Sequence, residues 1–503
     1  MRTKTAGGRD VNRLLRDFGH ELPSVPELQT PAKDPRLFRH ASMRGEFKPD
    51  RGWSPAKAPV SAWRMTSDQA PALWPFISTP GLPPTGAQMG VDHLSGGAFY
   101  LDPMGWVLDD KIPVTNPNIF SFGKPGRGKS ATTKAFCLRM MDFGYRTLIL
   151  GDPKDEYEAL CRAFGVEPFV IGHGMGARIN PLAIGPLGQG WAQLSAEDAR
   201  GRAAIVFARW LTLVRGLVGS QRIGERRVPF GPTEEAVVMQ ALKMLTGYAA
   251  GGSHLRETTI PKLWHLLDEP TEELIKETRY ATARHFLDET RLLRDALGQL
   301  VSGALAGLFD DHTTIDVDWA APIQSLSLSR LEPLGDEAVG IALLCLNSWG
   351  RGMREMAPAG DLRIVVRDES WKQLRLGPEA VKSFDADLRL SRRDGDIQFG
   401  VLHKPSDMLS AGDTGSQAVS IAKDLLHLAD IKILHGQDAG VTNQLEQMLG
   451  LTPIACDVVT NWAMQGKGRA LWCVGDQQYK VQTILHPAEQ QLTYTNEAIA
   501  GGA

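Results

Sequence analysis

Cysteine is scarce in this chain, and its distribution excludes two classes of protein. The 503 residues include five cysteines. They are Cys137, Cys161, Cys345, Cys456 and Cys473. No two of them form a Cys-x-x-Cys pair, so the sequence has neither the ligand spacing of a zinc site nor the framework of a small disulfide-bonded domain. We therefore expect buried thiols in a reducing compartment.

Long apolar runs and a secretory leader are also lacking. The longest apolar candidate, residues 338–346, is far shorter than the about 20 residues that cross a bilayer. The amino terminus is charged and has no apolar segment of the kind that a signal peptide needs. We expect a cytoplasmic protein without an integral membrane segment, which reaches the inner face of the cell membrane only through partners.

A positive net charge is the third missing feature. The formal charge is −3 at pH 7, so the chain as a whole does not indicate nucleic-acid binding, and any DNA contact has to be local. Residues 1–64 are a local exception, with 13 Lys and Arg against 7 Asp and Glu. Two interpretations of this proline-rich segment stay open, a basic arm for a partner and a solvated leader.

What the chain does contain is a phosphate-binding sequence. An apolar, strand-like run at 118–122 precedes two glycines separated by four residues, then Lys and Ser, then a helical pattern to residue 143. Strand, glycine loop and helix in this order are the P-loop arrangement. We expect the nucleotide to contact Gly123, Lys124, Pro125, Gly126, Arg127, Gly128, Lys129, Ser130 and Ala131.

Each residue type in this loop has a chemical reason. Gly126 and Gly128 leave backbone N–H groups open to phosphate oxygens, and the helix N-terminus adds unpaired N–H groups. Lys129 is expected to reach the β- and γ-phosphates, and Ser130 to place its hydroxyl on Mg²⁺. The expected nucleotide and metal are therefore ATP and Mg²⁺.

A second pattern supplies the carboxylates. A strand at 362–367 ends in Asp368 and Glu369, which is the Walker B form. Asp368 is expected to hold Mg²⁺ through water, and Glu369 to polarise the attacking water. With Lys129, these two residues are the main catalytic candidates.

Each of the further candidate residues has two possible roles. Glu156 follows a strand at 146–152 and either faces the γ-phosphate or caps the next helix. His403 and Lys404 follow a strand at 397–402 and either sense the γ-phosphate or face solvent. Arg392 and Arg469 are catalytic candidates as arginine fingers that reach a neighbour's nucleotide, or they are ordinary surface arginines.

The patterns divide the chain into five segments and predict an α/β fold with a mainly parallel sheet. We expect a further strand at 314–317 and a closing strand at 481–492. The segments are a basic arm at 1–64, a small β-rich lead-in at 65–115, the P-loop half of the core at 116–193, an all-helical insertion at 194–310, and the second half of the core at 311–503.

Four signatures stand in the order found in a known family. The P-loop, the turn 152–157, the run Asn180-Pro181-Leu182 and the run Asp368-Glu369-Ser370-Trp371 together resemble the TraC-like conjugative-transfer and type IV secretion ATPases of the HerA/FtsK group. The resemblance covers roughly residues 70–495. It departs at Asp155, where the family has Gly, and at 403–405, where the family often has Thr-Gln-Ser.

This resemblance implies a RecA-like P-loop ATPase core with a helical insertion and a short N-terminal extension. It implies a homo-hexamer with sites between subunits, which works with conjugation or secretion channel proteins at the inner membrane. The expected function is an ATP-hydrolysing motor subunit that powers conjugative DNA transfer or type IV secretion. A DNA-translocating or packaging ATPase of the HerA/FtsK type is the alternative, which the arginines between residues 215 and 227 keep open. A non-catalytic nucleotide-binding scaffold is disfavoured because the P-loop lysine and the Walker B pair are intact.

Overall fold

A computed structural model of the chain describes residues 81–494 with short gaps. The gaps are residues 176, 189, 225, 250–251, 304, 315–320, 355–359, 370–371, 373, 377 and 412–416. Residues 82–494 belong to one compact unit. The arm expected at 1–64 and most of the strand expected at 314–317 lie outside the described residues. The division into five segments stays a prediction.

Among the described residues, eleven strands form one sheet that is parallel over most of its width. All neighbours from β11 to β5 are parallel, and all neighbours from β2 to β11 are antiparallel. The expected α/β class with a mainly parallel sheet is therefore confirmed. In spatial order the strands are β2 (Ala98–Leu101), β1 (Ala87–Asp92), β13 (Gln477–Thr483), β12 (Arg469–Val474), β11 (Ile431–His435), β3 (Ile119–Phe122), β10 (Asp396–Leu402), β9 (Arg363–Arg367), β4 (Arg146–Asp152), β8 (Ile323–Ser327) and β5 (Phe169–Val170).

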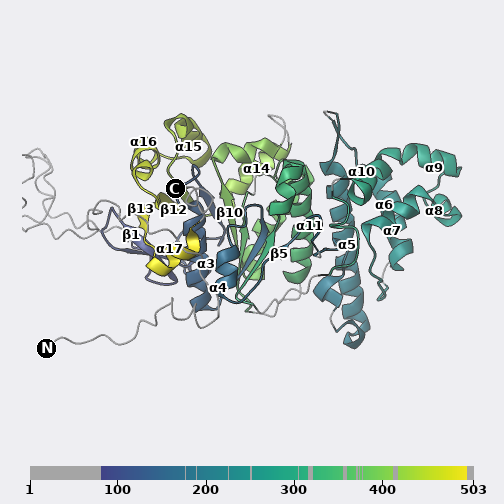
Figure 1. Cartoon of the computed structure of the whole chain (residues 1–503), viewed down its shortest axis with the longest axis horizontal. Coiled ribbons are helices and arrows are strands. Elements are labelled where there is room, and N and C mark those ends of the chain that lie inside the picture. The colour runs from purple at the N-terminus through teal and green to yellow at the C-terminus, as the bar shows by residue number, and fades with distance from the viewer. Residues whose placement is uncertain are drawn as a thin grey trace, which may run out of the picture. The chain divides into compact units, whose positions relative to one another are not determined.

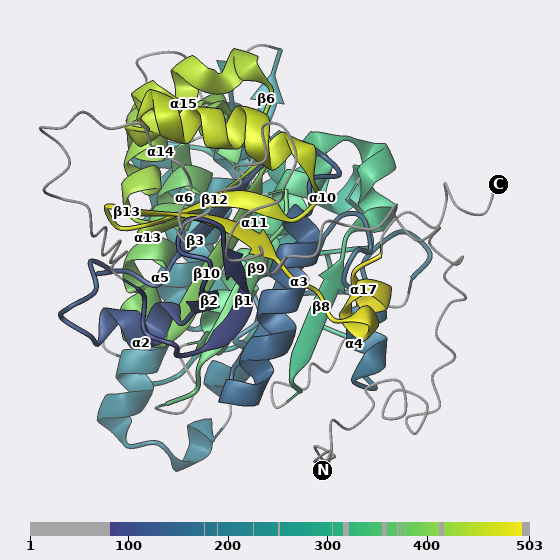
Figure 2. The same cartoon turned by 90° about the vertical axis from the view of Figure 1, so that its left-hand side faces the viewer.

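Helices cover both faces of the sheet because its central strands are buried on both sides. Figure 2 shows α3 and α4 on one side of the strands and α13 and α14 on the other. Successive side chains of β10 point to opposite faces of the sheet. Phe399 packs on Phe136 of α3 on one face. Leu402 joins a core with Phe384 and Leu388 of α13 on the other. The helices are α2 (Pro103–Val107), α3 (Lys129–Met140), α4 (Glu158–Ala163), α11 (Asp336–Arg354), α13 (Pro378–Asp394), α14 (Gln417–His427), α15 (Thr442–Leu449), α16 (Pro453–Asp457) and α17 (Pro487–Thr493).

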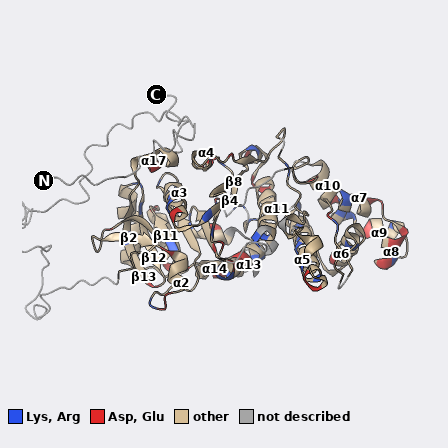
Figure 3. Ribbon diagram, turned by 90° about the horizontal axis from the view of Figure 1, so that it is seen from below, with Lys and Arg blue, Asp and Glu red and all other residues tan. Residues whose placement is uncertain are grey.

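Six more helices gather beyond α11 at one end of the unit (Figure 1). They are α5 (Ala196–Ser220), α6 (Pro232–Thr246), α7 (Ile260–Asp268), α8 (Glu272–Glu277), α9 (Ala283–Glu289) and α10 (Arg291–Ser302). Asp and Glu residues, red in the ribbon of Figure 3, make up much of α8 and α9, as expected of a solvated surface. The expectation of an all-helical insertion needs one correction, because β6 (Arg222–Ile223) and β7 (Arg226–Arg227) form an antiparallel hairpin between α5 and α6. Gly224, with a φ of 62°, permits this tight turn.

Helix α5 is the one described helix that is long and apolar enough to cross a membrane. Arg209 and Arg215 interrupt its apolar run, so no continuous run of about 20 apolar residues marks it in the sequence. The most apolar stretch of 18 residues in α5 is 56% buried inside the unit. Trp210, Val214 and Leu217 are fully buried there, so α5 also has the packing of a core helix in the helical region.

The closing strand expected at 481–492 is corrected by the structure. Strand β13 ends at Thr483, and α17 begins at Pro487. Proline at the first helical position and a capping box between His486 and Glu489 start a helix here and exclude a strand.

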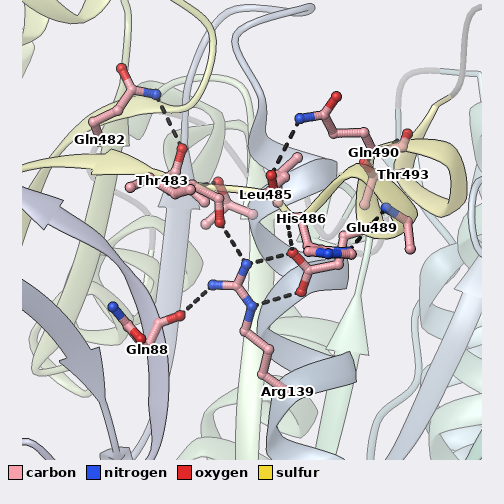
Figure 4. Close-up of polar contacts among 12 residues, drawn as sticks. Gln88, Arg139, Gln482, Thr483, Leu485, His486, Glu489, Gln490 and Thr493 are labelled. Atoms are coloured by element: carbon pink, nitrogen blue, oxygen red, sulfur yellow. Dashed lines mark hydrogen bonds and ion pairs between the residues drawn. The ribbon is translucent and has the colours of Figure 1, made fainter. Parts of the chain in front are cut away.

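Helix α17 packs against the P-loop helix through one guanidinium (Figure 4). Arg139 of α3 donates to both carboxylate oxygens of Glu489, at 2.7 and 2.6 Å. It also donates to the backbone oxygens of Ile484, at 2.6 Å, and of Gln88 on β1. One side chain therefore joins α3 to α17, to β1 and to the chain between β13 and α17.

Candidate nucleotide-binding site

The P-loop is held at the carboxyl edge of the parallel strands. The backbone N–H of Gly123 donates to the carbonyl oxygen of His403 at 3.0 Å, and that of Lys124 to Gly436 at 3.0 Å. These two acceptors directly follow β10 and β11, which flank β3 on either side. The start of the loop, directly after β3, is therefore fixed by hydrogen bonds to the ends of β10 and β11.

The glycines of the loop meet three different demands. A Cβ at Gly123 would lie 2.6 Å from the Cβ of His435, so side-chain packing excludes one. Gly126 has open space around it but a φ of 75°, and Gly128 has a φ of 101°. A Cβ at Gly128 would also lie 2.8 Å from the backbone nitrogen of Gly468. The backbone of the loop is thus exposed on one side and pressed against the 467–469 turn on the other.

Lys129 is the first residue of α3, and its side chain is buried at the base of the loop. Its ammonium donates to the carbonyl oxygen of Gly123 at 2.5 Å. Burial lowers the pKa of Lys129, and the nearby charges of Asp368 and Glu369 oppose that shift. Ser130 lies in the same first turn of α3, so its hydroxyl and the free N–H groups of the helix start belong to one small region.

The other loop side chains turn to the surrounding protein. The guanidinium of Arg127 donates to the carbonyl oxygen of Met464 at 2.9 Å, and the ammonium of Lys124 pairs with exposed Asp438 at 2.9 Å. Pro125 is exposed and Ala131 half-buried. The predicted contacts of these four residues with a nucleotide stay predictions.

The sheet order brings the Walker B pair to the same edge as the P-loop. Strand β10 lies between β3 and β9, and all three are parallel, so the residues after them share an edge. Asp368 and Glu369 follow β9 directly and are 7% and 5% exposed. Burial, followed by the charges of Glu156, Asp152 and Glu369, raises the pKa of Asp368 to about 7. This edge is therefore a concentration of negative charge that a cation would relieve.

Glu369 is held by two basic side chains. Its Oε1 pairs with the ammonium of Lys154, and its Oε2 lies 3.4 Å from the Nε2 of His403. Glu369 has a φ of 51°, a conformation that non-glycine residues seldom adopt. Burial would raise the pKa of Glu369, but the hydrogen bonds from His403 and Lys154 hold it well below its usual range.

The turn after β4 is built on Asp152 and brings Glu156 to the site. Buried Asp152 accepts hydrogen bonds from the backbone N–H groups of Tyr157, at 2.9 Å, and Lys154, at 3.2 Å. The N-cap residue of helix α4 is Tyr157, and it makes no capping hydrogen bond with its side chain, which disfavours the capping interpretation of Glu156. The charge of Glu156 acts on Lys129 and on Asp368, while its own role stays a prediction.

Sequence reasoning assigned no role to Lys134, which lies one turn beyond the P-loop. Its ammonium is fully buried, lacks a hydrogen-bond partner among the described residues and lies 5.4 Å from the ring centroid of Tyr157. Burial lowers the pKa of Lys134, and the charges of Glu156 and Asp152 oppose this.

The two candidate arginines lie at opposite ends of the strands, one at the amino and one at the carboxyl ends of the parallel strands. Arg392 is exposed at the end of α13, just before β10 begins, and so lies at the edge away from the P-loop. Arg469 begins β12 beside the last residue of β11, at the edge of the P-loop. Its guanidinium packs over Trp462 at 5.1 Å and donates to Gln482 at 3.1 Å. A trans-acting role stays a prediction for both.

The donor set at this edge fits Mg²⁺. Ser130 and Asp368 offer a hydroxyl and a carboxylate, which are the hard oxygen ligands that Mg²⁺ takes in small number beside phosphates and water. In the part of the chain that the structure describes, no cluster of three His, Cys, Asp or Glu forms an all-protein metal cage. The five cysteines are all free and buried, as expected.

Comparison with known proteins identifies the fold. No family model and no curated protein matches the sequence. Among solved structures, VirB4 of Thermoanaerobacter pseudethanolicus is similar with a TM-score of 0.62 and 20% identity, over 82% of this chain and 99% of that one. The fold is RecA-like. The core expected from the sequence is thereby confirmed.

A second group of structures has the same RecA-like fold. The bacterial conjugative coupling protein TrwB, in an unbound form, is similar with a TM-score of 0.52 and 12% identity, over 80% of this chain and 89% of that one. TrwB in complex with ADP and Mg²⁺ also has a TM-score of 0.52 and 12% identity, over 82% of this chain and 92% of that one. At these identities the likeness concerns the fold.

Proposed function

We propose that the chain is an ATP-hydrolysing motor subunit that powers conjugative DNA transfer or type IV secretion. The observation that carries the proposal is the meeting of Lys129 with Asp368 and Glu369 at one edge of a RecA-like sheet. The likeness to VirB4 over almost the whole of that chain, and to the coupling protein TrwB, supports the choice of machinery.

The roles of the residues follow from their chemistry. The N–H groups of the loop and the ammonium of Lys129 bind the phosphates, and Glu369 orients the attacking water. Ser130 and Asp368 would hold Mg²⁺, which supplies positive charge to the phosphate oxygens. The complex of TrwB with ADP and Mg²⁺ supports this pairing of nucleotide and metal.

The proposed assembly is a homo-hexamer with the nucleotide between subunits. In such a ring Arg392 or Arg469 of one subunit reaches the nucleotide of the next, and Arg469 is favoured because it already lies at the carboxyl edge. The proposed place of work is the cytoplasmic face of the inner membrane, with channel proteins of the conjugation or secretion machine as partners.

A DNA-translocating ATPase of the HerA/FtsK type is the second candidate. The hairpin β6–β7 favours it, because Arg222 and Arg226 are exposed on a short projecting turn. Exposed arginines on such a turn can contact phosphate groups of DNA in a salt-dependent way.

The proposal is tested by ATP turnover of the purified protein, with and without double- and single-stranded DNA, across a series of salt concentrations. Lys129→Ala is expected to abolish turnover because the loop loses its phosphate-binding ammonium. Turnover that is indifferent to DNA supports the secretion motor, and stimulation by DNA that fades with salt supports the DNA translocase. Turnover that survives in Lys129→Ala would contradict both.

A second variant tests the role of the Walker B pair. Glu369→Gln is expected to lower turnover by about 100-fold or more while ATP still binds, because an amide is a far weaker proton acceptor than a carboxylate. Isothermal titration calorimetry with ATP and a phosphate-release assay measure the two effects separately. Hydrolysis at the wild-type rate would show that Glu369 is not the base.

A further inference from the structure

Two lysines flank the Walker B pair from opposite sides. In the order β3, β10, β9, β4, the P-loop follows the first strand and the turn of Lys154 follows the last. Asp368 and Glu369 follow β9, between them. The charges of the two ammonium groups act on each other, and Asp368 and Glu369 act on both. Lys154 therefore belongs to the same small region as the phosphate-binding Lys129.

Lys154 is the more exposed member of its ion pair with Glu369. Its side chain is 44% exposed, whereas that of Glu369 is 5% exposed. Its backbone is fixed, because the N–H of Lys154 donates to buried Asp152 at 3.2 Å. A fixed backbone with a solvent-accessible four-carbon stem lets the ammonium swing while the turn stays in place.

The carboxylate of Glu369 does not depend on Lys154 alone. His403 lies 3.4 Å from its second oxygen, and the carbonyl oxygen of His403 also holds the P-loop at Gly123. If Lys154 turns away, the ammonium leaves Oε1, while the contact of Oε2 with His403 is kept.

We propose that Lys154 is a second phosphate-binding lysine, which leaves Glu369 for the terminal phosphate of a nucleoside triphosphate and so distinguishes ATP from ADP. This inference rests on the proposed ATPase function. In this inference Lys154 binds the third phosphate, and its ion pair with Glu369 breaks as a consequence. A diphosphate offers no terminal group on the β4 side and leaves the ion pair in place.

The experiment measures binding in the Glu369→Gln background, where the carboxylate charge is gone. Without that charge, any effect of Lys154 on nucleotide affinity comes from the nucleotide itself and not from an exposed Glu369. Isothermal titration calorimetry with Mg²⁺ and either ADP or a non-hydrolysable ATP analogue compares Glu369→Gln with the double variant that adds Lys154→Met. Lys423→Met, on the exposed face of α14, is the matched control.

The double variant is expected to bind the ATP analogue about tenfold or more weakly than Glu369→Gln, which is the size of one lost charge-assisted contact. ADP affinity is expected to stay within about twofold, which also shows that the variant is folded. Lys154→Arg is expected to keep most of the preference for the triphosphate, since it keeps the positive charge.

Three other results would overturn the inference. Unchanged affinities for both nucleotides would mean that Lys154 serves only Glu369. An equal loss of both affinities would mean a general structural role. If Glu369→Gln itself bound neither nucleotide, the proposed ATPase function would fall together with the inference, so the two failures are distinguishable.

Discussion

Gly126 and Gly128 stand two residues apart in the P-loop and share a positive φ, yet their surroundings differ. Nothing lies within 4 Å of the position of a Cβ at Gly126. At Gly128 the nearest atoms are the backbone nitrogen and Cα of Gly468, at 2.8 and 3.1 Å. The Gly468 N–H also donates to the carbonyl oxygen of Arg127 at 3.0 Å, so the two backbones are joined at this point.

This pair predicts two different losses of stability. Gly126→Ala is expected to lower the free energy of unfolding by about 1 kcal/mol, from backbone strain alone. Gly128→Ala is expected to lower it by about 3 kcal/mol or more, because it adds a clash with backbone that cannot move cheaply. Urea unfolding without nucleotide measures both. Equal losses would show that the 467–469 turn is not pressed against the loop.

Asp152 carries a prediction on pH. Burial raises its pKa from 3.8 to about 6, against the hydrogen bonds from Tyr157, Glu156 and Lys154. Because the folded state then holds a proton that the unfolded chain has lost, the free energy of unfolding falls as the pH rises from about 4 to about 6. The full cost is present above that range.

Asp152→Asn lacks this titration. The difference in unfolding free energy between the variant and the wild type is therefore expected to shift in favour of the variant by up to about 3 kcal/mol between pH 4 and pH 7. Urea unfolding at several pH values measures it. A difference that does not change with pH would mean that Asp152 is solvated in the folded protein.

At this scale the sequence predicted the residues whose chemistry repeats between proteins. The P-loop and the Walker B pair were found because their spacing and the strands before them follow from phosphate binding. Lys154 and Lys134 were not given roles, because an isolated lysine has no spacing rule and its importance depends on carboxylates from distant strands. The two basic partners of Glu369 become evident only in the folded structure.

At the scale of elements, the contact of α17 with α3 is the least expected. Arg139 is 20% and Glu489 11% exposed, so the pair is largely removed from water (Figure 4). Arg139 also satisfies two backbone oxygens, which would lose their donor with it. The P-loop helix is thereby tied at its far end to the carboxyl-terminal helix.

Glu489→Ala is expected to lower the free energy of unfolding by about 2–4 kcal/mol, because it leaves the guanidinium of Arg139 partly buried without its charge partner. Arg389→Ala is the matched control. It breaks an exposed ion pair with Asp385 at 2.8 Å and is expected to cost less than about 1 kcal/mol. Chemical denaturation compares the two variants. A loss for Glu489→Ala no larger than the control would show that α17 does not hold α3.

Element boundaries show where local rules succeed and where they need more information. A 3-10 turn at Met141–Phe143 extends the P-loop helix, and Gly144 ends that turn as expected, in a left-handed conformation with a φ of 83°. The carboxyl-terminal segment was predicted as one strand, although Pro487 marks a helix start. The hairpin β6–β7 is too short for periodicity to reveal it.

At the scale of the whole molecule, the strands could be listed from the sequence but not ordered. Apolar runs bounded by glycine and carboxylates predicted most strands of the parallel part. Their order in space depends on packing between segments hundreds of residues apart, which composition does not encode locally. Strands of the antiparallel part were predicted at both ends of the chain, but not their pairing, in which β1 lies beside β13.

The position of β3 has a consequence for how the protein is made. Its two neighbours in the sheet, β10 and β11, begin at Asp396 and Ile431, long after the P-loop has left the ribosome. During synthesis the emerging P-loop strand therefore has neither of its partners, and its apolar residues stay open to chaperones. The residues His403 and Gly436, whose carbonyl oxygens anchor the loop, belong to the last fifth of the chain, so the loop cannot take its final position until most of the chain has been made.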